Sequence, residues 1–266
     1  MTQQAPGGPD RAEIALGRAQ ELVYDAWEAD TDLERVRLAK RALAISKQCA
    51  DAHVLLAETS AKGIVDMRRH YERGVAAAEA AIGRRLFEEA VGHFWGVFET
   101  RPYMRARAGL GECLWDLGER EAAIGHYREL LRLNPNDNQG LRWTLASWLL
   151  TVEDHDAVEK LLAAYEGDAF ADWPYTRTLL SFRQGDEVGA RGALRKAWKA
   201  NPHVPDLLLG ITFLPVELAE TIAFGSSEEA EVYVARSVAN WNATRGALEW
   251  LDQAVRPMRR KSRKRR

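Results

Sequence analysis

The side chains best suited to metal binding or nucleophilic catalysis are few and widely spaced in this sequence. None of the six histidines lies four residues from another, and the HExxH pattern of helical zinc sites is absent. The GxSxG and GxxxxGK patterns of serine hydrolases and phosphate loops are absent too. Cys49 and Cys113 fall in separate apparent helices, so they supply neither a paired-cysteine zinc site nor a disulfide framework. The sequence therefore predicts no metal, no cofactor and no enzyme.

Polar side chains gather around Pro135, where a small ligand could bind. Such a run usually forms a turn and the N-cap of the next helix, because short polar side chains accept hydrogen bonds from backbone N–H groups. That role explains one or two members, and the others could face a ligand. The run comprises Asn134, Asn136, Asp137 and Asn138.

An enzyme or ligand sensor that combines this cluster with His93, Arg101 and Arg105 is one alternative function. His93 stands beside Phe94 and Trp95, where a hydrogen-bonded core or helix-end imidazole is commoner than a ligand or a base. The alternative requires a deep pocket with convergent polar groups, whereas an open channel favours a peptide.

The charge is divided unevenly along the chain. Eight of the 37 Lys and Arg residues, and none of the 39 Asp and Glu residues, lie from Arg256 onward, so the first 255 residues carry a formal charge of −10. The basic end is expected to be disordered, and it could bind anions through salt-dependent contacts with phosphates. The candidate anion-binding residues are Arg259, Arg260, Lys261, Arg263, Lys264, Arg265 and Arg266.

Helix pairs at a period of about 34 residues are expected to position these side chains. The clearest pair runs from Met104 to Asp137, where Leu110-Gly111 and Tyr127 occupy the small and large positions of the tetratricopeptide pattern and Pro135 ends the second helix. Two further pairs fit between Pro135 and Pro202. The hydrophobic spacing before Met104 predicts additional hairpins, including a helix over Phe87–Phe98.

The pattern changes after Pro202, where a terminal cap is expected to cover the open end of the core. Ser226 and Glu229 form a predicted capping box that opens a helix, and Thr244 is a plausible cap for the last helix. The predicted fold is an all-α, tetratricopeptide-like α-solenoid of stacked helical hairpins with a C-terminal helical cap. Its predicted parts are a disordered N-terminus (1–12), the helical repeats (13–202), the cap (203–255) and a basic disordered tail (256–266).

The first helix of each pair lines the concave surface in this repeat class, and partners usually bind there. Arginine, tryptophan and tyrosine dominate the energetics of protein interfaces, so a groove that mixes them suits a peptide. The predicted groove residues are Arg101, Arg105, Glu112, Trp115, Asn138, Arg142, Trp143 and Tyr175.

Several stretches resemble the suppression-of-tumorigenicity-seven family. The run over Ala42–Val65 (ALAISKQCADAHVLLAETSAKGIV) is similar to a segment of that family. Runs similar to those at Glu99–Trp115, Leu133–Gly140 and Gly246–Leu251 occur in related bacterial tetratricopeptide proteins. The resemblance implies tetratricopeptide-like helices, and it implies no particular activity. Animal members carry membrane-spanning N-terminal segments, which this sequence is not expected to share.

The sequence thus favours a non-catalytic scaffold that binds a peptide or protein partner in its concave groove. A second alternative is a nucleic-acid-associated regulator that uses the basic C-terminal tail for weak nucleic-acid contact. The polar first ten residues predict no signal peptide, and the longest apolar run, Leu207–Leu214, is too short to span a bilayer. A cytoplasmic protein without a membrane span is therefore expected.

Overall fold

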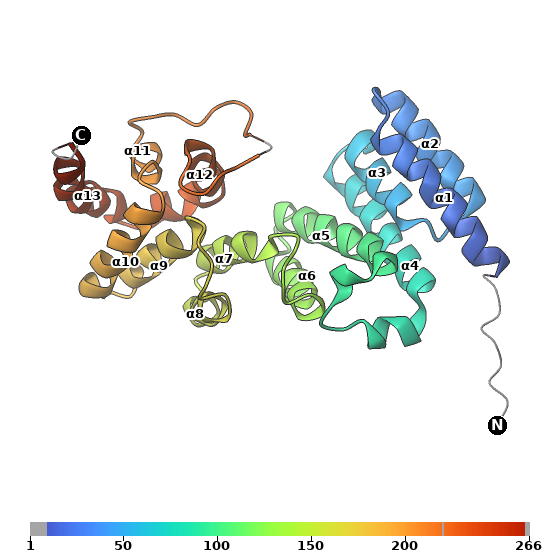
Figure 1. Cartoon of the computed structure of the whole chain (residues 1–266), viewed down its shortest axis with the longest axis horizontal. Helices are drawn as coiled ribbons and strands as arrows, with labels where there is room; N and C mark the ends of the chain where they lie inside the picture. The colour runs from blue at the N-terminus through green and yellow to red at the C-terminus, as the bar shows by residue number, and fades with distance from the viewer. Residues whose placement is uncertain (1–9, 220, 264–266) are drawn as a thin grey trace. The chain divides into compact units, whose positions relative to one another are not determined.

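The computed structural model describes residues 10–219 and 221–263, and these form helices and no β-strand (Figure 1). The all-α solenoid of helical hairpins that the sequence predicts is confirmed. The chain divides after Leu141 into two compact units, unit 1 (residues 1–141) and unit 2 (residues 142–266). None of the helices in the described ranges is long and apolar enough to cross a membrane.

Unit 1 consists of three helical hairpins, in which α1 packs on α2, α3 on α4 and α5 on α6. The first helices of successive hairpins also touch, α1 with α3 and α3 with α5, as in a stacked solenoid. The helices are α1 (Arg11–Trp27), α2 (Asp32–Ile45), α3 (Ala50–Ser60), α4 (Ile64–Glu89), α5 (Arg101–Asp116) and α6 (Arg120–Leu133).

Two glycines of α5 allow tyrosines of neighbouring helices to cross it closely. A Cβ atom built on Gly111 would lie 2.7 Å from the Tyr127 ring, and one built on Gly109 would lie 2.2 Å from the Tyr71 ring. Real Cβ atoms do not approach other atoms so closely, so both positions need glycine. The small-residue position that the sequence pattern assigns to Gly111 therefore has this packing role.

The helix predicted over Phe87–Phe98 is wrong. The backbone of α4 kinks at Gly83 (φ 67°, ψ 160°), and Gly92 has a φ of 92°, which an α-helix cannot continue. Two short 3₁₀ turns follow, η1 (Phe94–Gly96) and η2 (Phe98–Thr100). The buried Thr100 hydroxyl donates to the carbonyl oxygens of Phe94 and Val97 and fixes this segment.

Unit 2 contains two further hairpins and three C-terminal helices. Here α9 packs on α10, and α11 contacts both α12 and α13. The helices are α7 (Leu141–Thr151, whose first residue closes unit 1), α8 (His155–Ala164), α9 (Asp172–Arg183), α10 (Glu187–Ala200), α11 (Val204–Leu208), α12 (Ser227–Ala243) and α13 (Ala247–Arg263).

The predicted boundaries of the last two helices are partly correct. The Ser226 side chain accepts a hydrogen bond from the Glu229 backbone N–H at 3.2 Å and opens α12 as expected. The capping box is incomplete, because the Glu229 carboxylate is bound elsewhere. Thr244 does not cap α13; it ends α12, and its hydroxyl donates to the Asn240 carbonyl oxygen at 2.7 Å.

The basic end begins as a helix rather than as the predicted disordered tail, because α13 continues to Arg263. Ion pairs with Asp252 and Asp206 hold Arg256 and Arg259 on this helix. The side chains of Lys261 and Arg263, and all of Lys264, Arg265 and Arg266, lie outside the described residues, as does most of the N-terminal stretch predicted to be disordered.

Candidate partner-binding groove

The first helices of the hairpins in unit 1, α1, α3 and α5, form one face, which we call the groove face of unit 1. Two aromatic rings of α1 lie on it 5.7 Å apart: Tyr24 is 53% exposed and Trp27 is 37% exposed. Apart from the three hairpins, the two 3₁₀ turns between α4 and α5 and the first residue of α7, the described residues of unit 1 form no helix. From within the unit, therefore, no helix lies across this face.

A buried carboxylate ties the three helices of this face together. Asp51 of α3 is fully buried and accepts two hydrogen bonds from Arg105 of α5, at 2.8 and 2.5 Å. Gln20 of α1 donates to the same carboxylate at 2.9 Å, and the Arg105 guanidinium lies 5.3 Å from the Trp27 ring centre. Removing one partner of a buried ion pair is strongly destabilising, because the other charge is left buried without compensation. The main role of Arg105 is therefore to hold α5 against α3.

Two glutamates follow this pair at equal spacing along the groove face. Glu58 and Glu112 each lie seven residues after the corresponding member of the Asp51–Arg105 pair. The Tyr127 hydroxyl donates to Glu112 at 3.0 Å, and the Tyr71 hydroxyl donates a longer bond of 3.5 Å to Glu58.

Both of these carboxylates keep an exposed surface, and neither forms an ion pair with any described residue. Partial burial raises the pKa of Glu58 and of Glu112 above the usual glutamate value of 4.5. A cationic group that docked beside them would compensate this desolvation. The groove face of unit 1 is therefore suited to a partner with basic side chains.

The remaining residues predicted for the groove in unit 1 have local roles. The Arg101 guanidinium donates to the Trp95 carbonyl oxygen at 2.9 Å and lies 4.1 Å from the Phe98 ring centre, which holds the 3₁₀ turns. Trp115 is half-buried and lies 5.4 Å from the Arg120 guanidinium. Asn138 is exposed and accepts a hydrogen bond from Asn134 at 3.2 Å.

The polar cluster around Pro135 is chiefly a turn. Asp137 has a φ of 48°, and its side chain accepts a hydrogen bond from the Leu141 backbone N–H at 2.8 Å, at the start of α7. His93 is exposed beside the first 3₁₀ turn, while Arg105 is bound to Asp51. Of the residues of the ligand-sensor alternative, Arg101, Arg105 and Asp137 are thus bound to separate local partners.

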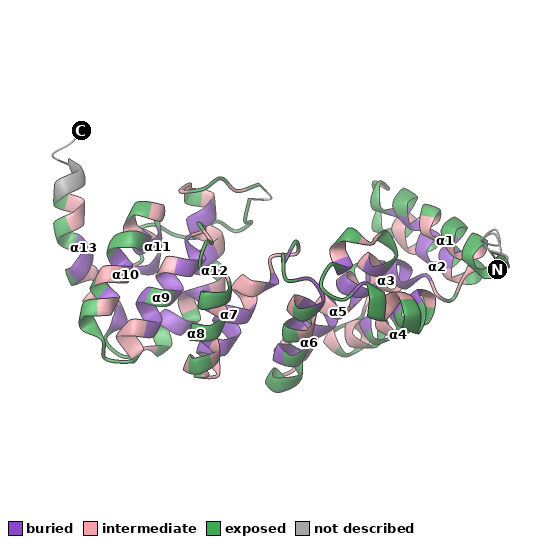
Figure 2. Ribbon diagram, turned by 60° about the horizontal axis from the view of Figure 1, so that its bottom comes forward, coloured by how far each residue is buried: buried purple, intermediate pink, exposed green. Residues whose placement is uncertain are grey.

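In unit 2 the corresponding face is formed by α7 and α9, the first helices of its two hairpins, and it is covered by α12 of the same unit. Ser147 of α7 donates to the Arg236 carbonyl oxygen at 2.8 Å, and the Asn240 side-chain amide donates to the Ser147 carbonyl oxygen at 3.0 Å. Arg183 of α9 donates to the Leu150 and Asn240 carbonyl oxygens, at 2.5 and 3.0 Å. Figure 2 shows buried residues along much of α9.

The N-terminal turn of α12 is held by the buried carboxylate of Glu229, which is 2% exposed. It accepts hydrogen bonds from the Ala171 backbone N–H at 2.8 Å, the Asn201 side-chain amide at 2.9 Å and the Gly225 backbone N–H at 2.5 Å. Hydrogen bonds to a charged acceptor are stronger than those between neutral groups, so Glu229 anchors α12 at the start of α9.

Further along α12, Arg236 forms an ion pair with Asp172 in the first turn of α9. Burial raises the pKa of Asp172 above its usual value of 3.8, although the Arg236 guanidinium opposes this shift. Arg236 also lies 5.9 Å from the Trp143 ring centre. Asp172 therefore binds a cation from α12, as Asp51 binds one from α5.

The predicted groove residues of unit 2 are occupied by contacts within the unit. Tyr175 is fully buried, its ring lies 5.5 Å from that of Tyr233 on α12, and its hydroxyl donates to the Asn201 carbonyl oxygen. Arg142 and Trp143 both donate to Asp168, at 2.7 and 2.8 Å. The prediction that Tyr175 faces a partner is therefore corrected, because its ring is buried against Tyr233 of α12. Arg142 and Trp143 are bound to Asp168 of their own unit.

The structure shows no metal or thiol chemistry in its described part. No group of three or more His, Cys, Asp or Glu side chains is placed to hold a metal ion there. Cys49 and Cys113 are buried, and burial raises the pKa of each thiol to about 11, which keeps it protonated near neutral pH.

Sequence reasoning missed the residues that distinguish the two faces. Aligning the sequence of α3 with that of α5 places Asp51 opposite Arg105 and Glu58 opposite Glu112. This alignment could have identified both acidic residues from the sequence. Arg236 and Asn240 carried no such signal, since α12 lies outside the repeats, and Glu229 was noticed only as the partner of Ser226 in a capping box.

These features define a tetratricopeptide-type helical repeat protein. The crystal structure of YrrB, described as a TPR protein with an unusual peptide-binding site, superposes with a TM-score of 0.50 and 17% identity, over 71% of this chain and 85% of YrrB. The model of the ST7 protein family matches residues 12–184. The chain belongs to the ST7 family.

Relatives of known sequence agree with this assignment. The suppressor of tumorigenicity 7 protein-like of Gallus gallus is 26% identical over 260 residues, which cover 89% of this chain and 47% of the relative. That of Rattus norvegicus is 28% identical over 254 residues (87% and 45%), and the protein ST7 homolog of Caenorhabditis elegans is 27% identical over 280 residues (89% and 51%). The chain thus spans about half the length of these relatives.

Proposed function

We propose that the chain is a non-catalytic protein-interaction scaffold that binds a segment of a partner protein on the groove face of unit 1. The observation that carries this proposal is the contrast between two equivalent faces: α12 lies on the face of unit 2, while the described residues of unit 1 place no helix over its face. YrrB, a structural neighbour described as having a peptide-binding site, supports a peptide as the occupant.

Unit 2 also indicates how such a face accommodates a helix. It uses the buried carboxylate of Asp172 at the start of α9, hydrogen bonds from small polar side chains, and the contact between the rings of Tyr175 and Tyr233. Unit 1 offers aromatic surface at Tyr24 and Trp27, and two carboxylates without a cationic partner at Glu58 and Glu112. We therefore propose an amphipathic partner helix with Lys or Arg opposite these two glutamates.

The test is selection of 16-residue helical peptides from a displayed library on the full chain. Selected peptides should be rich in Lys and Arg. Their affinity, measured by calorimetry, should fall about tenfold for the double variant E58Q/E112Q, since two charge-assisted contacts are lost. Binding should also strengthen as pH rises through the elevated pKa values of Glu58 and Glu112, because only the ionised carboxylates attract a cation.

A matched control is E79Q/E121Q, which removes two exposed carboxylates from α4 and α6, the second helices of their hairpins. The control should bind as tightly as the unaltered chain. Selected peptides that bind E58Q/E112Q normally, or that lose equal affinity with the control, would contradict the proposed site.

A further inference from the structure

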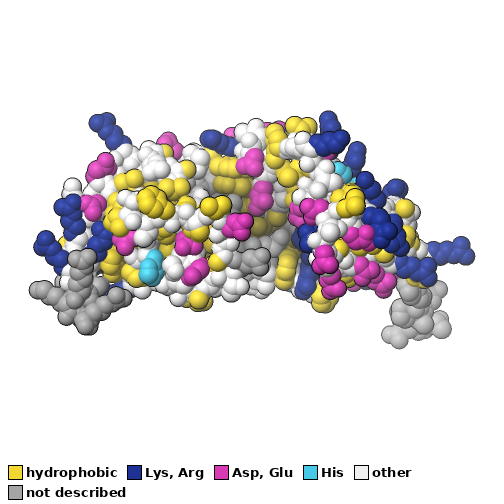
Figure 3. All heavy atoms as spheres, turned by 90° about the horizontal axis from the view of Figure 1, so that it is seen from above, with side chains coloured by type: hydrophobic (Ala, Val, Ile, Leu, Met, Phe, Trp, Pro, Cys, Tyr) yellow, Lys and Arg dark blue, Asp and Glu magenta, His cyan; other side chains and the backbone are white. Residues whose placement is uncertain are grey.

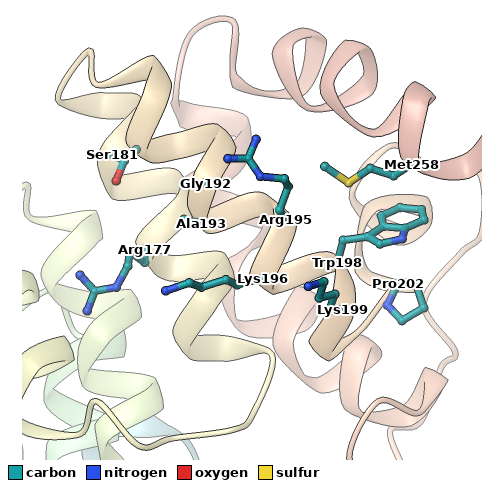
Figure 4. A pocket seen from close by; sticks show the side chains of 11 residues that line it. Arg177, Ser181, Gly192, Ala193, Arg195, Lys196, Trp198, Lys199, Pro202 and Met258 are labelled. Atoms are coloured by element: carbon teal, nitrogen blue, oxygen red, sulfur yellow. The ribbon is translucent and has the colours of Figure 1, made fainter. Parts of the chain in front are cut away.

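A basic depression lies on unit 2, on the hairpin of α9 and α10. Its volume is about 980 Å³, and α13 contributes Met258 to its wall (Figure 4). Its charged and aromatic lining consists of Arg177, Arg195, Lys196, Trp198 and Lys199.

The depression exists because small residues of α10 leave space between longer ones. Gly192 and Ala193 form part of its lining, and the helix carries a cluster of long side chains one turn later. Figure 4 shows Arg177 and Lys196 at one end and Trp198, Lys199 and Pro202 at the other. Along α10 the lining residues, from Gly189 to Lys199, span about 15 Å at 1.5 Å per residue.

The charge of the depression is uncompensated. Four cationic side chains line it, and no Asp or Glu is among the described residues that do so. Arg191, an exposed cation of the same helix, is by contrast paired with Glu187. No described residue forms an ion pair with any of the four, which are Arg177, Arg195, Lys196 and Lys199.

This grouping is a local exception to the net charge of −10 over the first 255 residues. Like charges repel, so a cluster of cations without counter-charges disfavours the folded state unless an anion binds. Trp198 adds a partly exposed indole among the cations. Cations along a groove together with an aromatic surface are the combination that binds single-stranded nucleic acids, through phosphate contacts and base stacking.

We propose that the basic depression binds single-stranded nucleic acid, with the four cations on successive phosphates and Trp198 against a base. This activity is separate from the scaffold function proposed for unit 1. It also differs from nucleic-acid binding by the basic C-terminal residues. The variants in the test below leave those residues unchanged, so a loss of binding cannot come from them.

The test is fluorescence anisotropy with a labelled 12-nucleotide single strand and the full chain over a series of salt concentrations. The variant K196Q/K199Q should bind about tenfold more weakly than the unaltered chain. Its slope of log K against log salt should be shallower by about 1.4, since each phosphate contact on a single strand contributes about 0.7. W198L should lose several-fold in affinity with an unchanged slope, because stacking is not ionic.

The matched control is K40Q/R41Q, which removes two exposed cations from α2 in unit 1 and changes the net charge equally. It should bind as the unaltered chain does. Equal binding by K196Q/K199Q and the unaltered chain, or an equal loss with the control, would overturn the proposal.

A competition experiment distinguishes a nucleic acid from a phosphate-rich molecule without bases. Inorganic polyphosphate of matched charge should displace the labelled strand about tenfold less effectively than unlabelled strand, because it has no base to stack on Trp198. Equal displacement, with no effect of W198L, would overturn the assignment to nucleic acid. Circular dichroism should show the same helical content in all variants.

Discussion

The two units carry equivalent faces that are used in opposite ways. In unit 1 the faces of α1, α3 and α5 hold exposed aromatic rings and two glutamates, whose hydrogen-bond donors among the described residues are tyrosine hydroxyls. In unit 2, α7 and α9 are hydrogen-bonded to α12 from Glu229 near its start to Asn240 in its last turn, and to Thr244 directly after it. The repeat geometry provides a helix-binding face in both units, and the residues outside the repeat decide what occupies it.

The carboxylates show the difference most directly. Glu229 is buried and accepts three hydrogen bonds, whereas Glu112 is exposed and accepts one from Tyr127. Desolvating a carboxylate requires several donors to compensate. Glu229 is therefore part of the folded structure of unit 2, while Glu112 remains available to a partner.

The largest expected effect comes from removing the anchor of α12. The variant E229A leaves the Ala171 and Gly225 N–H groups and the Asn201 amide without their acceptor, so it should lower the free energy of unfolding of unit 2 by about 3–5 kcal/mol. The variant E112A should cost less than about 1 kcal/mol. Urea unfolding followed by circular dichroism measures both. Similar losses would mean that the two carboxylates do not differ in this way.

The two Arg–Asp pairs offer a second comparison. The variants R105A and R236A each leave a buried aspartate, Asp51 or Asp172, without its cation, so each should lower stability by about 2–4 kcal/mol. They should differ in location. Hydrogen exchange should increase in residues 227–243 for R236A and not for R105A. Faster exchange of α12 in both variants would contradict the separate roles of the pairs.

Acidification should weaken unit 1 before unit 2. Burial and the neighbouring His70, Arg73 and Lys47 lower the pKa of His53 from 6.5 to about 4, so the unfolded chain binds more protons between these values. The contribution is fully present above pH 6.5 and is lost as pH falls towards 4. With partial exposure taken into account, it amounts to about 1–2 kcal/mol.

Urea midpoints at pH 7.5 and pH 5 test this expectation, since the variant H53Q should remove most of the difference. H203Q, in unit 2, is the matched control and should keep it. An unchanged pH dependence in H53Q would exclude His53 as its source.

The smallest effect is expected in the segment that connects α11 to α12. Hydrophobic side chains are exposed in unit 2 (Figure 3), among them Phe213 (86%) and Val216 (fully exposed). The variants F213S and V216S should each change the free energy of unfolding by less than about 0.5 kcal/mol, because neither side chain is packed. A larger loss that depended on protein concentration would show that this segment is buried between copies of the chain.

Much of the solenoid could be predicted from the sequence because its signals are local. The periodicity around Leu110-Gly111, Tyr127 and Pro135 identified the hairpin of α5 and α6, and Ser226 identified the start of α12. The helix over Phe87–Phe98 failed because α4 ends at Glu89 and Phe94, Trp95 and Phe98 belong to two 3₁₀ turns. Gly92, which takes a positive φ, was given no weight.

What the sequence by itself determined is the repeat: its period, its small-residue positions and the placement of charge at the C-terminal end. Tertiary structure alone decided which face is available. The contact of Arg236 with Asp172 joins residues 64 positions apart, and that of Asn240 with Ser147 joins residues 93 apart. Such pairings depend on where α12 docks, and no local periodicity encodes them. For the same reason Tyr175 looked like a groove residue in sequence and is a core residue in the fold.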